Sequence, residues 1–234
     1  MLYAVSYAQK GPARFLSHLE VVRVFERAFR RASLPLKLSQ GFNPRPYLWF
    51  ALPLPVGTAG RSEYLVVELA EPFGPEAVLG RLAPELPEGF ALKAVRSVAP
   101  GADLSRLAEA AAYRVRPGWR PEPRPEEVRQ AAKELMGRPS FSVTVKDKPK
   151  DIRPGILVLR ARPRASRLVL VMLLSTEPGR YVRPEAVLHA LAELGGWKAE
   201  EPPWVERLGL FTCRGPRLLP LGVALASRGA EGGG

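Results

Sequence analysis

Two hydrophobic periods alternate along this chain, and their order constrains its fold more than any other feature. A period of two residues predicts a strand, and a period near 3.6 predicts a helix. In the first hundred residues these periods predict strands over 2–9, 47–52, 63–70 and 91–98 and helices over 17–32 and 75–86. The order β-α-β-β-α-β is that of the split βαβ, or ferredoxin-like, unit, an antiparallel sheet with both helices on one face.

The second half of the chain repeats this order with one extra strand. Strands are predicted over 111–116, 141–145, 156–162, 168–174 and 205–212, and helices over 125–136 and 184–194. We therefore predict an α+β fold of two ferredoxin-like (βαββαβ) domains in tandem, each an antiparallel sheet with helices packed on one face. The expected domains are 1–100 and 101–226, followed by a Gly-rich tail, 227–234, that we expect to be disordered.

The composition limits the cofactor sites, the cell compartment and the growth temperature that we expect for this protein. The single cysteine, Cys213, excludes an intramolecular disulfide, and two histidines leave too few ligands for a typical zinc site, so we expect no cofactor. No apolar run is long enough to span a membrane, which favours a cytoplasmic protein without a membrane partner. One Asn, three Gln and 25 Pro are typical of a thermophile.

The positive charge is concentrated in two segments. The net charge is +12, and residues 1–50 carry eight basic and two acidic side chains, while 138–167 carry nine and two. Such clustering indicates a basic surface that holds a polyanion, provided that the two segments meet in space. The alternative is two unrelated solvated faces.

The first basic segment contains a capping-box sequence and a row of arginines. Ser17 and Glu20 have the S-x-x-E spacing that starts a helix at Ser17. Four arginines follow at helical spacing, and with Arg14 they form the first set of predicted RNA contacts: Arg23, Arg27, Arg30 and Arg31. His18, in the first helical turn, is a candidate general base for a ribose hydroxyl. The alternative for His18 is local packing or capping.

The turn 39–46 (SQGFNPRP) is the second candidate site. Gln40, Asn43 and Arg45 carry groups that bind base edges or phosphate, and Phe42, Tyr47 and Trp49 are candidates for stacking on bases. The alternative is that Asn-Pro and Gly-Phe only shape the loop. For Trp49 and Phe50 we favour a place in the core.

The second basic segment has alternating charge over 146–154, which we interpret as a loop. Lys146, Lys148, Lys150 and Arg153 are predicted to follow a phosphate backbone. Alternatively, Asp151 and Arg153 pair with each other or with the first domain. The chain contains no phosphate-binding loop, no dinucleotide fingerprint, no G-x-S-x-G elbow and only three Asp, which disfavours nucleotide-driven, hydrolase or two-metal chemistry.

Several segments together resemble one family. They are RFLSHLE at 14–20, SQGFNPRP at 39–46, FALPLPVG at 50–57, EYL at 63–65 and DIRP at 151–154. The chain resembles the radical-SAM-linked (radical SAM-associated) proteins, a domain family of unknown function, with Glu20 where Asp is usual. The resemblance implies a separate radical-SAM protein as partner, and that protein would carry the radical chemistry.

The leading hypothesis is a non-catalytic RNA-binding accessory protein that works with a radical-SAM enzyme in modification or processing of tRNA or rRNA. The basic segments 10–45 and 138–167 would line one cleft. A helix-borne histidine in paired ferredoxin-like domains is also similar to CRISPR RNA-processing endoribonucleases, so a metal-independent endoribonuclease using His18 is a second hypothesis. The third is an adaptor that binds only its radical-SAM partner.

Overall fold

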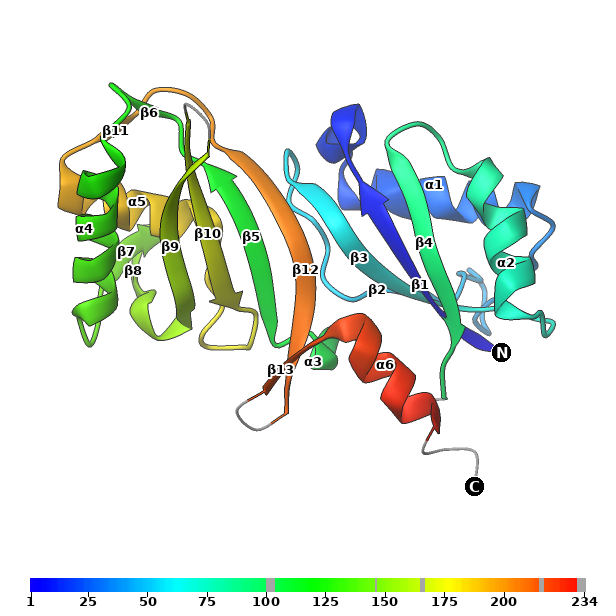
Figure 1. Cartoon of the computed structure of the whole chain (residues 1–234). Coiled ribbons are helices and arrows are strands. Elements are labelled where there is room, and N and C mark those ends of the chain that lie inside the picture. The colour runs from blue at the N-terminus through cyan, green and yellow to red at the C-terminus, as the bar shows by residue number, and fades with distance from the viewer. Residues whose placement is uncertain (100–103, 146, 165–166, 215–216, 231–234) are drawn as a thin grey trace. The chain divides into compact units, whose positions relative to one another are not determined.

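The chain has a mixed α and β architecture with mostly antiparallel strands (Figure 1). The computed structural model describes residues 1–99, 104–145, 147–164, 167–214 and 217–230. It divides into two compact units. Unit 1 comprises Met1–Ala108 and the chain from Gly209 onward, and unit 2 comprises Glu109–Leu208.

Unit 1 contains the first predicted β-α-β-β-α-β series and the C-terminal elements. Its elements are β1 (Leu2–Gln9), η1 (Gly11–Phe15), α1 (His18–Arg31), β2 (Leu48–Phe50), β3 (Ala59–Glu68), α2 (Pro75–Leu82), η2 (Ala83–Glu85), β4 (Phe90–Ser97), α3 (Leu104–Leu107), the end of β12 (Trp204–Arg214), β13 (Arg217–Pro220) and α6 (Leu221–Ala230). Strand β1 pairs antiparallel with β3 and β4, and β2 pairs antiparallel with β3.

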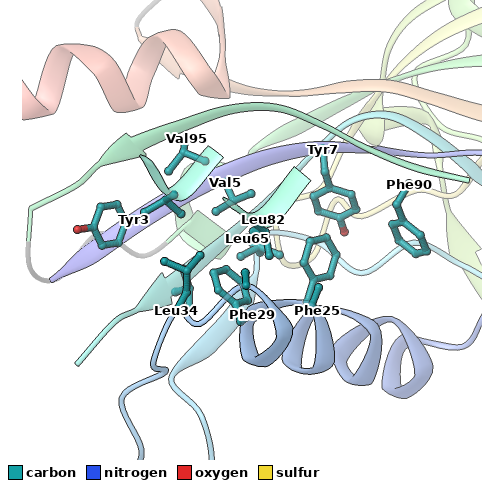
Figure 2. Packing of buried hydrophobic residues seen from close by; sticks show 14 of the residues in the cluster. Tyr3, Val5, Tyr7, Phe25, Phe29, Leu34, Leu65, Leu82, Phe90 and Val95 are labelled. Atoms are coloured by element: carbon teal, nitrogen blue, oxygen red, sulfur yellow. The ribbon is translucent and has the colours of Figure 1, made fainter. Parts of the chain in front are cut away.

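The register of these strands builds one apolar layer. Val5 lies opposite Leu65 on one side and opposite Val95 on the other, and all three are buried. Phe25 and Phe29 of α1 pack against this layer, as Figure 2 shows, and the ring of Phe25 lies 4.8 Å from that of Tyr7. Every second residue of these strands therefore faces α1 and α2 and contributes to the core.

Helix α1 begins where the sequence predicts. The side chain of Ser17 accepts a hydrogen bond from the Glu20 amide, and the Glu20 carboxylate accepts one from the Ser17 amide at 2.8 Å. This capping box satisfies amides that a helix start otherwise leaves unpaired. The pKa of Glu20 is lowered, first by its hydrogen bond to the Ser17 side chain and then by that to the Ser17 backbone.

The opposite face of the unit 1 sheet is covered by α6, an element absent from the sequence prediction. Ala4, Ser6 and Tyr64 of the sheet line a cavity of about 330 Å³ together with residues of α6. Helices therefore do not lie on a single face in this unit. The helix extends to Ala230, so it includes the start of the predicted disordered tail; 231–234 lie outside the described residues.

Unit 2 contains the second predicted series. Its elements are β5 (Ala110–Arg116), β6 (Trp119–Arg120), α4 (Pro125–Gly137), β7 (Ser142–Val145), β8 (Lys148–Asp151), η3 (Arg153–Gly155), β9 (Ile156–Arg164), β10 (Arg167–Ser175), α5 (Pro184–Gly195), β11 (Lys198–Ala199) and the start of β12. Strand β10 pairs antiparallel with β9 and β5, so the strands predicted over 156–162 and 168–174 form a hairpin. Helix α4 packs on β9 and on α5.

Several features of unit 2 differ from the sequence prediction, among them the sheet of β6 and β11, strand β8 and the course of the last strand. Lys148–Asp151 form strand β8, antiparallel to β7, where we predicted a loop. The Pro and Lys content hides this strand, because such residues are tolerated mainly at sheet edges. In addition, the last predicted strand, β12, begins in unit 2 and ends in unit 1.

Candidate nucleic-acid interface

The predicted RNA contacts divide between the two units. Those from the first basic segment lie in unit 1, while Lys148, Lys150 and Arg153 lie in unit 2. Lys146 lies outside the described residues. We therefore consider each unit by itself.

The turn 39–46 is a closed loop with an aromatic tip. Its ends are joined by a bridge between Leu38 and Pro46, by a 2.8 Å hydrogen bond from the Ser39 amide to the Arg45 carbonyl, and by a 3.0 Å bond from the Arg45 amide to the Ser39 hydroxyl. Phe42, near the middle of the loop, has a fully exposed side chain. Single exposed apolar side chains are common on protein surfaces, so Phe42 becomes informative only together with other accessible aromatic side chains nearby.

Two further aromatic rings follow this loop. Tyr47 and Trp49 have ring centroids 5.3 Å apart, and Trp49 is 49% exposed. The alternate residues Leu48 and Phe50 pack against the core of unit 1. The prediction of a core position is therefore confirmed for Phe50 and wrong for Trp49. We call Phe42, Tyr47 and Trp49 the aromatic group.

The other predicted side chains of the loop are also accessible. Gln40, Asn43 and Arg45 are exposed, and their side chains form no hydrogen bond or ion pair with the described residues. The nearby Lys37 differs, since its ammonium group binds the Glu68 carboxylate at 2.6 Å and lies 5.7 Å from the Tyr47 ring. This hydrogen bond to Glu68 raises the pKa of Lys37.

The arginines of α1 lie on its exposed side, opposite the buried Val21, Phe25, Ala28 and Phe29. Within the described part of the chain, Arg27 and Arg30 have no carboxylate partner, whereas Arg31 donates to Glu85 at 2.8 Å and also to the Glu85 carbonyl. A carboxylate bound to an arginine offsets part of its positive charge, so that arginine attracts a phosphate less strongly. Arg31 is therefore the weakest member of the predicted set, and Arg23, Arg27 and Arg30 are the accessible cations.

His18 is the first residue of α1, and Arg14 lies in the preceding short helix η1. The His18 ring is exposed and meets Phe50 edge-on, with centroids 5.1 Å apart. In the described residues no side chain hydrogen-bonds this imidazole, so nothing orients it as a general base would be oriented. Arg14 stacks over Phe15 at 4.6 Å, its buried Nε has no partner among the described residues, and its carbonyl accepts the Gly57 amide at 2.7 Å.

In unit 2, two of the predicted cations already bind carbonyl groups. Arg153 donates to the Met136 carbonyl at 2.7 and 3.2 Å and to the Ile156 carbonyl at 3.1 Å. Asp151 accepts the amides of Phe141 and Arg153. The DIRP motif thus joins the end of α4 to β7 and β9. Lys150 donates to the Tyr181 carbonyl at 2.5 Å, and Lys148 is exposed.

Sequence reasoning named Tyr47 and Trp49 as candidates for stacking on bases but favoured a core position for Trp49. A signal against that position was present, because only every second side chain of a strand faces the core. On β2 the side chains of Leu48 and Phe50 pack against the core, so the intervening Trp49 is exposed. The all-apolar composition of this segment favoured the core position instead.

Comparisons with known proteins give a family and a fold likeness. A family model described as "Uncharacterized protein conserved in bacteria (DUF2344)" matches residues 3–184. No curated protein matches this chain. It is similar to a chain of the structure described as "Crystal Structure of a Cbf5-Nop10-Gar1 Complex", at 12% identity and a TM-score of 0.50, over 88% of this chain and 48% of that one.

The structural likeness concerns fold alone, and this chain spans about half the length of that relative. No helix in the described residues is both long and apolar enough to cross a membrane. The family match covers well over half of the chain. This protein therefore belongs to the DUF2344 family of uncharacterized proteins conserved in bacteria.

Proposed function

We propose that this protein binds RNA through unit 1 and that the aromatic group stacks on unpaired bases. The observation that carries the proposal is the fully exposed Phe42, on a loop closed by the Leu38–Pro46 bridge and by the bond from the Arg45 amide to the Ser39 hydroxyl, with the exposed Trp49 nearby in sequence. Every base has a π-face, so aromatic stacking suits single-stranded RNA. Arg45 on the same loop and Arg23, Arg27 and Arg30 on α1 supply accessible positive charge for phosphate.

The wider role is that of an accessory protein for a radical-SAM enzyme in tRNA or rRNA modification or processing. The resemblance to radical-SAM-linked proteins supports this partner. We expect the protein itself to be located in the cytoplasm. We also propose that both units are ferredoxin-like. The sheet orders β4-β1-β3-β2 in unit 1 and β12-β5-β10-β9 in unit 2 support this, because each has its first and third strands in the centre.

The direct test is a fluorescence-anisotropy titration of labelled tRNA at several salt concentrations. We expect binding that weakens as salt rises, and Phe42→Ala combined with Trp49→Ala should weaken it roughly 5- to 100-fold. Leu218→Ala, which removes an exposed apolar side chain from β13, is the control and should leave affinity unchanged. Absence of binding even at low salt would reject the proposal.

The same variants separate RNA binding from the adaptor role. If the protein co-purifies with a radical-SAM protein and never binds RNA, the aromatic group serves a protein contact instead. The endoribonuclease alternative gains no support from His18, whose ring packs perpendicular to that of Phe50 and has no hydrogen-bond partner among the described residues. Incubation with RNA and a chelator tests it, since cleavage abolished by His18→Ala would establish that activity.

A further inference from the structure

A cavity in unit 2 has the composition of a site for a small organic anion. The hairpin β7–β8, the segment 181–183 and one face of α5 enclose about 480 Å³. This volume lies in the range of small-molecule sites in proteins. The cavity belongs wholly to unit 2, so it is separate from the aromatic group and does not rest on the function proposed for unit 1.

Two cations stand at one side of this cavity. Lys150 Nζ lies 5.7 Å from the centre of the Tyr181 ring, and the Arg183 guanidinium lies 5.9 Å from the same ring. Lys150 uses one N–H on the Tyr181 carbonyl, which leaves two for a ligand. Arg183 has no ion pair with any described residue. Both cations are thus positioned by Tyr181 while their remaining donors stay available.

The other lining residues are mostly apolar. Val143, Ile152 and Val182 are buried parts of the wall, and Val145 remains 39% exposed beside them. Glu185, Ala186 and His189 come from successive turns of α5. Glu185 is the single carboxylate of the lining and, within the described residues, it neutralises neither cation. The site therefore offers two positive charges against one negative charge, next to an apolar wall.

We propose that this cavity binds a nucleotide. The phosphate would interact with Lys150 and Arg183, because charge-assisted hydrogen bonds are the strong ones, and the base would lie on the wall that includes Val145. A phosphate alone would leave the apolar wall unused, and a nucleoside alone would leave the two cations unused. The same chemistry arises from a free nucleotide and from the phosphorylated end of an RNA chain, and Lys148 on the same hairpin suits either source.

Titration calorimetry on the full chain tests the site with each ribonucleoside 5′-monophosphate, with adenosine and with inorganic phosphate. We expect at least one monophosphate to bind saturably, at least about tenfold tighter than adenosine or phosphate. Arg183→Gln should weaken that binding about tenfold or more. Arg180→Gln, an exposed arginine outside the lining, is the matched control and should have no effect. Ala186→Leu should also weaken binding by filling the cavity, with an unchanged unfolding midpoint showing that the variant folds.

A second arm distinguishes the two sources. Short RNAs with a 5′-phosphate or a 5′-hydroxyl are compared in the Phe42→Ala/Trp49→Ala background, which removes the unit 1 contribution. A preference for the 5′-phosphate that Arg183→Gln abolishes assigns the site to an RNA end. The proposal is overturned if neither monophosphates nor 5′-phosphorylated RNA bind, or if Arg183→Gln and Arg180→Gln behave alike. Neither result bears on RNA binding by unit 1.

Discussion

At the scale of single residues, Ser17 and Glu20 show how a local pattern fixes a structural detail. The S-x-x-E spacing predicts both the helix start and the reciprocal hydrogen bonds that the structure contains. Arg31 and Arg153 behave differently. Arg31 binds Glu85, 54 residues away, and Arg153 binds the Met136 carbonyl, 17 residues away. Tertiary structure determines such partners, so the spacing of residues in the sequence does not predict them. For this reason both arginines were predicted to bind RNA, although the structure shows them bound to groups of the protein itself.

The Ser17 cap gives a prediction for stability. Ser17→Ala removes the side chain that accepts the Glu20 amide, and it should lower the free energy of unfolding by about 1 kcal/mol. Guanidinium chloride unfolding at neutral pH measures this change. Ser140→Ala, at an exposed serine outside any helix or strand, should change the free energy of unfolding by less than about 0.5 kcal/mol. Equal effects of the two substitutions would contradict the capping role.

The lowered pKa of Glu20 gives a prediction for pH dependence. The ordinary value is 4.5 and the folded value is lower, because the ionised carboxylate accepts hydrogen bonds from Ser17. The carboxylate therefore contributes stability that is present above pH 4.5 and is lost as the pH falls through the folded pKa. Glu20→Gln keeps an acceptor without the charge. We expect wild type to be more stable than Glu20→Gln at neutral pH, with the difference disappearing in acid; a constant difference would contradict this.

At the scale of elements, the strong periodic segments were predictable and the short ones were not. The sequence predicted α1, α4, α5 and the β9–β10 hairpin close to their observed bounds, because their apolar periods extend over several turns or a whole strand. Strand β8 was missed because Pro149 and the two flanking lysines disfavour a strand. Pairing with β7 nevertheless stabilises the extended conformation of this segment. Helix α6 was missed because its apolar residues follow a turn-rich segment with little polar contrast.

The motif at 151–154 acts as a connection between elements, and this gives a prediction. Arg153→Met removes three hydrogen bonds to the carbonyls of Met136 and Ile156, and it should lower the free energy of unfolding by about 2 kcal/mol. Arg129→Met removes only the exposed ion pair with Glu126 on α4, so it should cost less than about 1 kcal/mol. Chemical unfolding of the two variants gives the comparison. A smaller effect for Arg153→Met than for Arg129→Met would exclude the connecting role.

Helix α1 contains its own control for phosphate binding. Arg27 and Arg30 have no carboxylate partner in the described residues, while Arg31 binds Glu85. Arg27→Ala with Arg30→Ala should reduce the slope of log affinity against log salt by up to about 1.4 for single-stranded RNA, since each neutralised phosphate contributes about 0.7. Arg31→Ala should leave the slope nearly unchanged. If Arg31→Ala alters the slope as strongly, the ion pair with Glu85 does not limit this arginine.

At the scale of the whole molecule, the two basic segments of the sequence lie in different units. Unit 1 contains the segment 1–50, and unit 2 contains 138–167. A common cleft lined by both segments remains a proposal. The structure of unit 1 adds what charge alone does not give, namely three aromatic side chains on one loop and the strand that follows it. Unit 1 therefore has accessible cations and aromatic side chains, the two kinds of group on which the proposed binding of single-stranded RNA depends.

The measurement that tests this account most directly is ultraviolet crosslinking of the intact protein to single-stranded RNA, followed by mass-spectrometric mapping of the crosslinked peptides. Short wavelengths join bases to aromatic side chains in direct contact with them. We predict that the dominant crosslinks fall on Phe42, Tyr47 or Trp49 and disappear when an equal amount of RNA duplex replaces the single strand. Crosslinks that fall elsewhere and leave this loop unmodified would contradict the proposed RNA surface.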